Sequence, residues 1–315
     1  MILVTGATGF VGRHLVQGLA ESGLPVRALV RPRRGRSGGD LWSAPVSLIT
    51  GTVEDSQALH RAMSGVHTVI HLAGAPPWAS ARTLYDVDVE GTRNVVAVAR
   101  SVRVGRIIAL SHIGADRSSA YTLMRVKGEM EEVVRRSGLA YTLIRCGMLF
   151  GQDDRTINAI AMQLAASPGV FFIPADGDSL IHPLWIDDLV KGIINALDNL
   201  DSVDQTLSVG GPEYLTYDQT VRTVMRVMGM YRALVSLQPY WLRQFAWIFR
   251  RVQPRPVFTS QWYDRIAESR TADLNSMSDH LGVRPARFED TIMTYMPGRR
   301  YRREMIRYIL GRRPY

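Results

Sequence analysis

The first twelve residues, Met1–Gly12, read MILVTGATGFVG, and this stretch decides the fold. A short apolar run precedes glycines at positions 6, 9 and 12, and RHLVQGLAE at 13–21 then places apolar residues on one face of a helix. The pattern predicts a strand at Ile2–Val4, a glycine turn and a helix N-terminus. The free amides of such a helix end suit a pyrophosphate, and glycine lets the backbone approach it closely.

The glycine spacing is G-x-x-G-x-x-G, whereas the usual dinucleotide fingerprint is G-x-G-x-x-G. The longer spacing resembles the extended and atypical branches of the short-chain dehydrogenase superfamily. It could also belong to an ordinary tight turn between a strand and a helix. As nucleotide contacts the stretch predicts the turn residues and the first helical turn, which are Gly6, Thr8, Gly9, Phe10, Val11 and Gly12.

The residues at the end of the second predicted strand, Pro25–Val30, indicate which of the two nicotinamide dinucleotides binds. An acidic residue at this point binds a free ribose 2′-hydroxyl. Here the chain continues as RPRRGR, so guanidinium groups stand where a 2′-phosphate would need them. This favours NADP(H) over NAD(H), with Arg31 and Arg33 as the predicted contacts. The alternative is a solvated basic loop.

Predicted strands and helices alternate up to about residue 150. The elements expected after the second strand are 46–50, 56–63, 67–72, 87–102, 106–110, 123–137 and 140–145. Such alternation is typical of an α/β fold, a Rossmann-type doubly wound parallel sheet, here with a smaller mixed C-terminal region. Ligands of such sheets lie at the carboxyl ends of the strands, which adds Leu72, Ala73, Gly74 and Ser111 to the cofactor site.

We therefore expect three parts: a dinucleotide-binding domain at 1–150, a smaller region at 151–298 interleaved with the first, and a basic tail at 299–315. Of the 315 residues 46% are hydrophobic and 21% charged, as in soluble globular proteins. One cysteine excludes a disulfide framework and any cysteine-based metal site, and no metal site is predicted. No signal peptide and no membrane-spanning helix are expected, which makes the cytoplasm the predicted compartment.

Lysine is rare in this chain, with two residues against 36 arginines, and one of the two is Lys127 in the predicted helix 123–137. In short-chain dehydrogenases a tyrosine four residues before such a lysine acts as acid or base toward the substrate. Here Leu123 stands at that position. Tyr121 reaches the site only if the helix begins after it, and Ser111 is the candidate serine partner. The predicted catalytic residues are therefore Lys127, Ser111 and Tyr121, and the tyrosine–lysine pair is broken.

The net charge of +9 is concentrated in the last 17 residues, which carry seven arginines and one glutamate. With the aromatic segment Trp241–Phe249, the tail Arg299–Arg313 suits an anionic lipid surface or an acidic partner. The alternatives are a helix docked on the chain's own body and an aromatic segment buried in the second region. No nucleic-acid recognition motif accompanies the charge, so no nucleic-acid partner is expected.

Motifs along nearly the whole chain extend the resemblance. TGATGFVG, MRVKGEMEEVVRRSGLAYTLIR, LFGQDDRTIN at 149–158 and HPLWIDDLVKGIINAL at 182–197 resemble atypical short-chain dehydrogenases, most of all the NADPH-binding accessory subunit of respiratory complex I. The resemblance implies NADPH held as a structural cofactor, an adenine contact at Val53, and a C-terminal interface beside a membrane. Assembly factors of photosystem II are similar to the chain as well, since they also carry an apolar residue four positions before the lysine.

Two classes of function remain. The first is a non-catalytic subunit, peripheral on the cytoplasmic face of the membrane, that docks to a respiratory or photosynthetic membrane protein complex. The second is an active NADPH-dependent oxidoreductase or epimerase, in which Tyr121, His112 or a water supplies the proton and Lys127 orients the ribose. Leu123 favours the first class.

Overall fold

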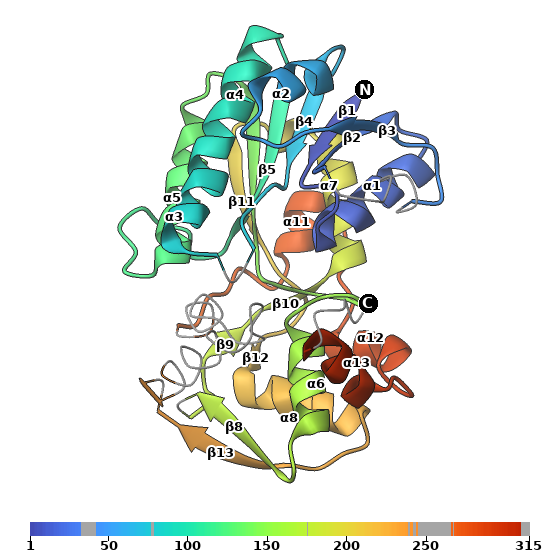
Figure 1. Ribbon diagram of the computed structural model, residues 1–315, viewed down its shortest axis with the longest axis vertical. Coiled ribbons are helices and arrows are strands. Elements are labelled where there is room, and N and C mark those ends of the chain that lie inside the picture. Colours follow the sequence, from blue (N-terminus) through green and yellow to red (C-terminus); the bar gives the residue numbers. More distant parts are fainter. Residues whose placement is uncertain are drawn as a thin grey trace. The chain divides into compact units, whose positions relative to one another are not determined.

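The computed structural model describes residues 1–32, 42–76, 79–174, 176–238, 240–241, 244, 266 and 268–309. The described chain forms two compact units, drawn in Figure 1, and each is built from three separate segments. Unit 1 comprises Met1–Cys146, Ile186–Val209 and Ser276–Val283. Unit 2 comprises Gly147–Trp185, Gly210–Asn275 and Arg284–Tyr315. Arg33 and most of the aromatic segment 241–249 lie outside the described residues.

Unit 1 contains a seven-stranded sheet in which every neighbouring pair of strands is parallel. The strands are apolar because helices cover both faces of the sheet. In sheet order they are β11 (Gln205–Val209), β6 (Ala140–Cys146), β5 (Arg106–His112), β4 (Thr68–His71), β1 (Ile2–Thr5), β2 (Val26–Val30) and β3 (Ser47–Thr50).

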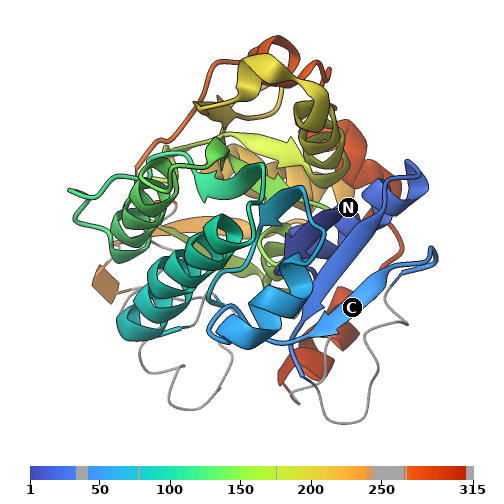
Figure 2. The ribbon, with the colours of Figure 1, turned by 90° about the horizontal axis from the view of Figure 1, so that it is seen from above.

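Two layers of helices enclose this sheet. In Figures 1 and 2, α4 and α5 lie side by side on one face, whereas α1 and α7 lie on the other. The described helices of unit 1 are α1 (Phe10–Glu21), α2 (Ser56–Met63), α3 (Ala81–Tyr85), a π-helical segment (Asp86–Glu90), α4 (Gly91–Ser101), α5 (Thr122–Arg135), α7 (Ile186–Asp198), a 3-10 turn (Leu200–Ser202) and α11 (Ser276–Leu281).

The order of the strands reverses beside β1. From β1 the chain moves outward through β2 and β3, then returns to the other side of β1 and continues through β4, β5 and β6. The carboxyl ends of β1 and β4 therefore border the crevice in which ligands of open α/β sheets bind. The predicted α/β class with a doubly wound parallel sheet is confirmed.

Unit 2 packs several helices around small sheets. Its strands pair as β7 with β10, β8 with β13 and β9 with β12, and only the last pair is antiparallel. The strands are β7 (Met148–Phe150), β8 (Val170–Pro174), β9 (Leu180–Ile181), β10 (Pro183–Trp185), β12 (Leu215–Thr216) and β13 (Ala233–Leu237). The described helices of unit 2 are α6 (Ile157–Ala166), α8 (Tyr217–Val227), α12 (Phe288–Tyr295) and α13 (Tyr301–Ile309).

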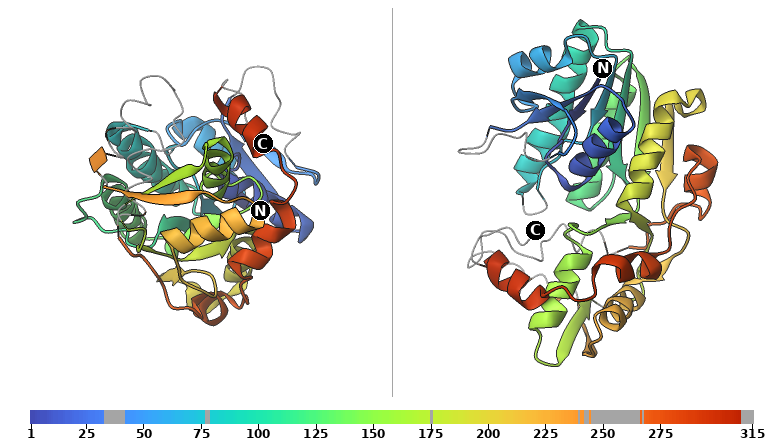
Figure 3. Two further views of the ribbon diagram at one scale, coloured as in Figure 1. Left: turned by 90° about the horizontal axis from the view of Figure 1, so that it is seen from below. Right: turned by 90° about the vertical axis from the view of Figure 1, so that its right-hand side faces the viewer.

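The basic tail forms α13, whose apolar side packs on its own unit. Tyr301 is fully buried, and Met305 and Tyr308 lie half-buried against the same core. Figure 3 shows α13, in red, beside α6, in green. The sequence left two possibilities open for the tail: a surface for a lipid or partner, or a helix docked on the chain's own body. Residues 301–309 form such a docked helix. Within the described ranges no helix is both long and apolar enough to cross a bilayer.

Candidate nucleotide-binding site

Two glycines where β1 connects to α1 leave no room for a side chain. Gly6 has a φ of 69°, and a Cβ added there would lie 2.6 Å from the carbonyl carbon of Leu72. A Cβ at Gly12 would lie 2.3 Å from the carbonyl oxygen of Gly6. All the atoms that it would meet belong to the backbone, so the clash cannot be relieved by a rotamer change. Glycine thus brings the first turn of α1 against the ends of β1 and β4.

The N-terminus of α1 is open to an anion. Gly9 is its N-cap and provides no side-chain cap, and the first turn contains no acidic residue. Amides at this end of a 12-residue helix carry partial positive charge and point along the axis. Thr8 lies half-buried in the turn, and Phe10 and Val11 begin the helix. A pyrophosphate fits this arrangement, because its oxygens would accept hydrogen bonds from amides for which no capping side chain is an acceptor.

The loop that follows β4 is held by a buried carboxylate. Asp88 of the π-helical segment is 2% exposed and accepts a hydrogen bond of 2.8 Å from the amide of Ala75. Its other oxygen lies 2.7 Å from Nζ of Lys127 on α5. A Cβ at Gly74 would lie 3.7 Å from the same Nζ, so the lysine reaches the carboxyl end of β4. Leu72, Ala73 and Gly74, the predicted cofactor contacts of this loop, thus lie at the carboxyl end of β4.

His71, the last residue of β4, anchors the start of this loop. The Thr92 hydroxyl donates to the carbonyl of Asp88, so it accepts from Nε2 of His71. Nδ1 of the ring then accepts from the Thr5 hydroxyl at 2.8 Å, and the Thr5 oxygen accepts from the amide of Ala73. The chain of hydrogen bonds requires a neutral imidazole protonated on Nε2. Burial, with the nearby ammonium of Lys127, lowers the pKa of His71 to about 4.

We expect the stability of the protein to fall with acidification because of His71. The folded-state pKa of about 4 lies below the ordinary histidine pKa of 6.5, so the stabilising effect of neutral His71 is complete above pH 6.5 and is lost as the pH falls from 6.5 to 4. The full loss amounts to roughly 3 kcal/mol of unfolding free energy. Urea unfolding of the His71→Gln variant should show a flatter pH dependence over this window. His60→Gln, at an exposed histidine of α2, should keep the wild-type slope.

The three predicted catalytic residues come from two elements, Ser111 from β5 and Lys127 from α5, with Tyr121 directly before α5. Helix α5 begins at Thr122, and Tyr121 precedes it as the N-cap residue. The helix therefore begins after Tyr121, as the prediction that Tyr121 reaches the site requires. Tyr121 lies half-buried against the apolar cluster that encloses Leu123, itself 3% exposed. Ser111, near the carboxyl end of β5, is buried, and its hydroxyl has no hydrogen-bond partner among the described residues. An orphaned donor at this strand end is consistent with a ligand contact.

The structure describes two of the three residues predicted to contact the adenosine part of the nucleotide, Arg31 and Val53. Arg31 directly follows β2 and is exposed, as a 2′-phosphate contact requires. Arg33 lies outside the described residues. Val53 is buried in the core of unit 1, and its carbonyl accepts a hydrogen bond of 3.2 Å from the side chain of Asn94. In the part of the chain that the structure covers, no group of three or more histidine, cysteine, aspartate or glutamate side chains could hold a metal ion.

The glycine turn and the uncapped amides of α1 fit the phosphates of a dinucleotide. Residues 6–169, more than half of the chain, match a family model described as NAD(P)H-binding. The chain belongs to this NAD(P)H-binding family. A nicotinamide nucleotide bound here would supply hydride chemistry, and the glycine turn and the α1 amides would hold its phosphates.

Two curated relatives extend the comparison. The photosystem II assembly factor Ycf39 of Cyanophora paradoxa is 33% identical over 151 residues, which are 48% of this chain and 46% of that protein. The mitochondrial NADH dehydrogenase (ubiquinone) 1 alpha subcomplex subunit 9 of Mus musculus is 28% identical over 299 residues, covering 91% of this chain and 77% of that one. The chain thus spans about half the length of the first relative. The resemblance to the complex I subunit is confirmed.

Among solved structures, the UDP-glucose 4-epimerase of Thermotoga maritima superposes with a TM-score of 0.72 and is 18% identical. The match covers 93% of this chain and 97% of the epimerase. At that identity the likeness concerns the fold alone.

Sequence reasoning missed Asp88, His71 and Thr92. Asp88 is the middle acid of DVDVE at 86–90, and both flanking valines are buried. A carboxylate between two core positions of a predicted helix is a signal that it has a charged partner inside the fold. The partner itself, 39 positions further along the chain, required the structure.

Proposed function

We propose that the protein holds NADPH as a structural cofactor and serves as an accessory subunit of a membrane-associated electron-transfer complex. One observation carries the proposal. The position four residues before Lys127 is Leu123, buried in an apolar cluster with Leu84 and Val89. The site therefore has a nucleotide cradle and a lysine, but no phenol where family members that reduce carbonyls place their acid.

The pairing of Lys127 supports the same conclusion. A lysine that lowers the pKa of a catalytic tyrosine needs that tyrosine within a few ångströms. Here the ammonium is 2.7 Å from the buried carboxylate of Asp88. We propose that Lys127 contacts the nicotinamide ribose while Asp88 fixes its position, and that Ser111 and Tyr121 line the site without transferring a proton.

The variant Leu123→Tyr tests the missing phenol. We expect it to reduce no more carbonyl substrate than the wild type, because substrate positioning is absent as well as the acid. A positioned general acid contributes about 10²–10⁴-fold, so a gain of roughly 100-fold would contradict the proposal. Met124→Tyr is the matched control, since Met124 lies in the same cluster and is equally buried. NADPH oxidation with aldehydes and ketones is the readout.

We further propose that the nucleotide is NADP(H) rather than NAD(H). Arg31 stands exposed at the end of β2, where an acidic residue would favour a free hydroxyl. Arg31→Ala should weaken NADPH binding about tenfold, as for the loss of one charge-assisted contact, and leave NADH binding nearly unchanged. Titration calorimetry measures both dissociation constants. The exposed Arg100 of α4 provides the control, and an equal loss in Arg100→Ala would point to general charge effects.

The docking role is assigned to unit 2 and to the tail of the chain. We propose that the Trp241–Phe249 segment and the exposed arginines of Arg299–Arg313 face the partner complex and anionic lipid, and that the protein is peripheral on the cytoplasmic face of the membrane. The names of the two relatives, one a complex I subunit and one a photosystem II assembly factor, support a membrane complex as partner.

Purification from the native membranes in gentle detergent tests this role. The expected result is co-purification with a respiratory complex, at a constant ratio to its other subunits. An assembly factor is the second candidate, favoured by the 33% identity to the photosystem relative. It would appear only with incomplete complexes. A protein found free of any membrane complex would contradict both.

A further inference from the structure

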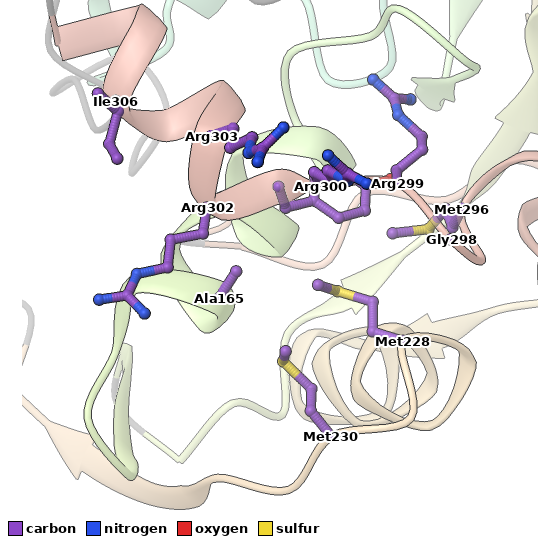
Figure 4. Close-up of a pocket in the computed structure, with 11 residues that line it drawn as sticks. Ala165, Met228, Met230, Met296, Gly298, Arg299, Arg300, Arg302, Arg303 and Ile306 are labelled. Atoms are coloured by element: carbon purple, nitrogen blue, oxygen red, sulfur yellow. The ribbon is translucent and has the colours of Figure 1, made fainter.

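A pocket of about 470 Å³ lies within unit 2, under the start of α13 (Figure 4). Its volume falls within the range of small-molecule sites. The walls come from the end of α6, the segment after α8 and the turn between α12 and α13. The lining residues are Ala165, Met228, Met230, Met296, Gly298, Arg299, Arg300, Tyr301, Arg302, Arg303 and Ile306. It belongs neither to the glycine turn nor to the lysine site.

One side of the pocket is apolar and adaptable. Figure 4 shows the side chains of Met228, Met230 and Met296 directed into the space beneath α13, with Ala165 on a further side. Methionine is unbranched and polarizable, so a wall of thioethers adjusts to flexible apolar ligands. Ile306, at the other end of the pocket, is 53% exposed and continues the apolar surface.

The other side is cationic. Arg300, Arg302 and Arg303 are exposed, and none of the described residues forms an ion pair with them. Arg299, by contrast, forms an ion pair: its Nη2 lies 3.1 Å from Oε1 of Glu304. None of the described residues that line the pocket is acidic. Three cationic residues, with no acidic residue in the described lining, therefore border an apolar cavity, and this combination complements an anion joined to a hydrocarbon chain.

A buried donor adds an independent observation. Tyr301 lines the pocket and is 2% exposed, yet its hydroxyl has no hydrogen-bond partner among the described residues. Burial raises the pKa of this phenol, so it stays protonated and able to donate. An unsatisfied buried hydroxyl costs free energy unless a ligand or water completes it. The hydroxyl itself is closed off from solvent, so it marks an unsatisfied donor beside the pocket rather than a headgroup contact.

We propose that this pocket binds one anionic lipid molecule, with an acyl chain among the three methionines and the phosphate on Arg300, Arg302 and Arg303. The inference deepens the membrane attachment in the proposed function and rests on it for its biological setting. It differs from adsorption to a charged surface, because it requires a single saturable site with an apolar interior.

Calorimetric titration of the full-length protein with lysophosphatidylglycerol, kept below its critical micelle concentration, tests the pocket. We expect one saturable site per chain. Lysophosphatidylcholine, which has the same chain but no net charge, should bind about tenfold more weakly. Glycerol phosphate, which has no chain, should show no saturable binding. Equal binding of the two lysolipids, or no binding of either, would overturn the proposal.

Two matched pairs of variants locate the site. Ala165→Phe fills the cavity without a change in charge, and Ala166→Phe places the same ring at the exposed neighbouring position. Arg303→Gln removes a lining cation, and Arg307→Gln removes an exposed arginine of α13 that does not line the pocket. The first member of each pair should weaken lysophosphatidylglycerol binding about tenfold, the second less than twofold. Equal effects within the pairs would contradict a pocket.

Sedimentation with vesicles that contain phosphatidylglycerol separates this inference from the proposed function. If the protein binds vesicles while monomeric lysolipid does not bind, the pocket fails and membrane attachment stands. If monomeric lipid binds the pocket but the protein does not co-purify with a membrane complex, the pocket stands and the accessory role fails.

Discussion

The Gly6→Ala variant is expected to lose nucleotide binding by at least about 100-fold while it still folds. Two effects act together. Alanine at a φ of 69° costs about 1 kcal/mol, and its Cβ would lie 2.6 Å from the carbonyl carbon and oxygen of Leu72. Because those atoms are backbone, the exit of β4 must move away from the turn. The crevice between β1 and β4 then loses the shape that brings the amides of α1 to the phosphates.

Gly65 provides a matched control. Its φ is also 69°, but a Cβ added there would meet nothing within 4 Å. Gly65→Ala should therefore lose about 1 kcal/mol of unfolding free energy and keep the wild-type dissociation constant. NADPH fluorescence measures binding, and circular dichroism checks that both variants are folded. A folded Gly6→Ala protein that binds NADPH within about threefold of wild type would show that the turn does not hold the nucleotide.

Asp88→Ala is expected to give the largest loss of stability, about 3–5 kcal/mol, because it leaves a buried charge without its partner. The Lys127 side chain is 12% exposed and lies 2.7 Å from the carboxylate. The amide of Ala75 loses its acceptor at the same time. We also expect weaker NADPH binding, since the loop after β4 and the lysine are both positioned by Asp88.

Asp86, two residues earlier, is the control for this change. Its carboxylate is 53% exposed and 3.8 Å from Arg82, so Asp86→Ala should cost less than about 0.5 kcal/mol. A double variant that combines Asp88→Leu with Lys127→Met removes both charges. It should recover much of the unfolding free energy that Asp88→Ala loses, but not the nucleotide affinity. Chemical denaturation and NADPH titration of the set separate the two effects. Full affinity in the double variant would exclude Lys127 from the site.

The alternating part of the fold was predictable because its signals are local. Buried parallel strands are apolar runs, and helix ends carry caps. The helix predicted at 56–63 is α2 within the same bounds, since Asp55 caps it by accepting from the amide of Ala58. The helix expected at 87–102 is instead part of a continuous helical stretch that begins with α3 at Ala81 and contains the π-helical segment Asp86–Glu90. The sequence signals a charged partner for Asp88 but not the π-helical geometry, because the packing of Asp88 on Lys127 belongs to the tertiary fold.

Non-local contacts account for what the sequence could not provide. The sheet of unit 1 is completed by β11, from far beyond residue 150, and covered by α7 and α11. These elements look alike in sequence whether they join the first unit or the second. In the same way, the environment of His71 depends on Thr5 and Thr92, which are distant along the chain.

The bound nucleotide of the protein isolated from its native source is the measurement that decides between a structural cofactor and an enzyme. Extraction and mass spectrometry, before and after incubation with a panel of aldehydes and ketones, give its identity, stoichiometry and oxidation state. We predict about one NADPH per chain, still reduced after incubation, as expected when no general acid is positioned. A protein that arrives empty, or whose NADPH is oxidised with turnover by one of the carbonyl compounds, would contradict a structural role.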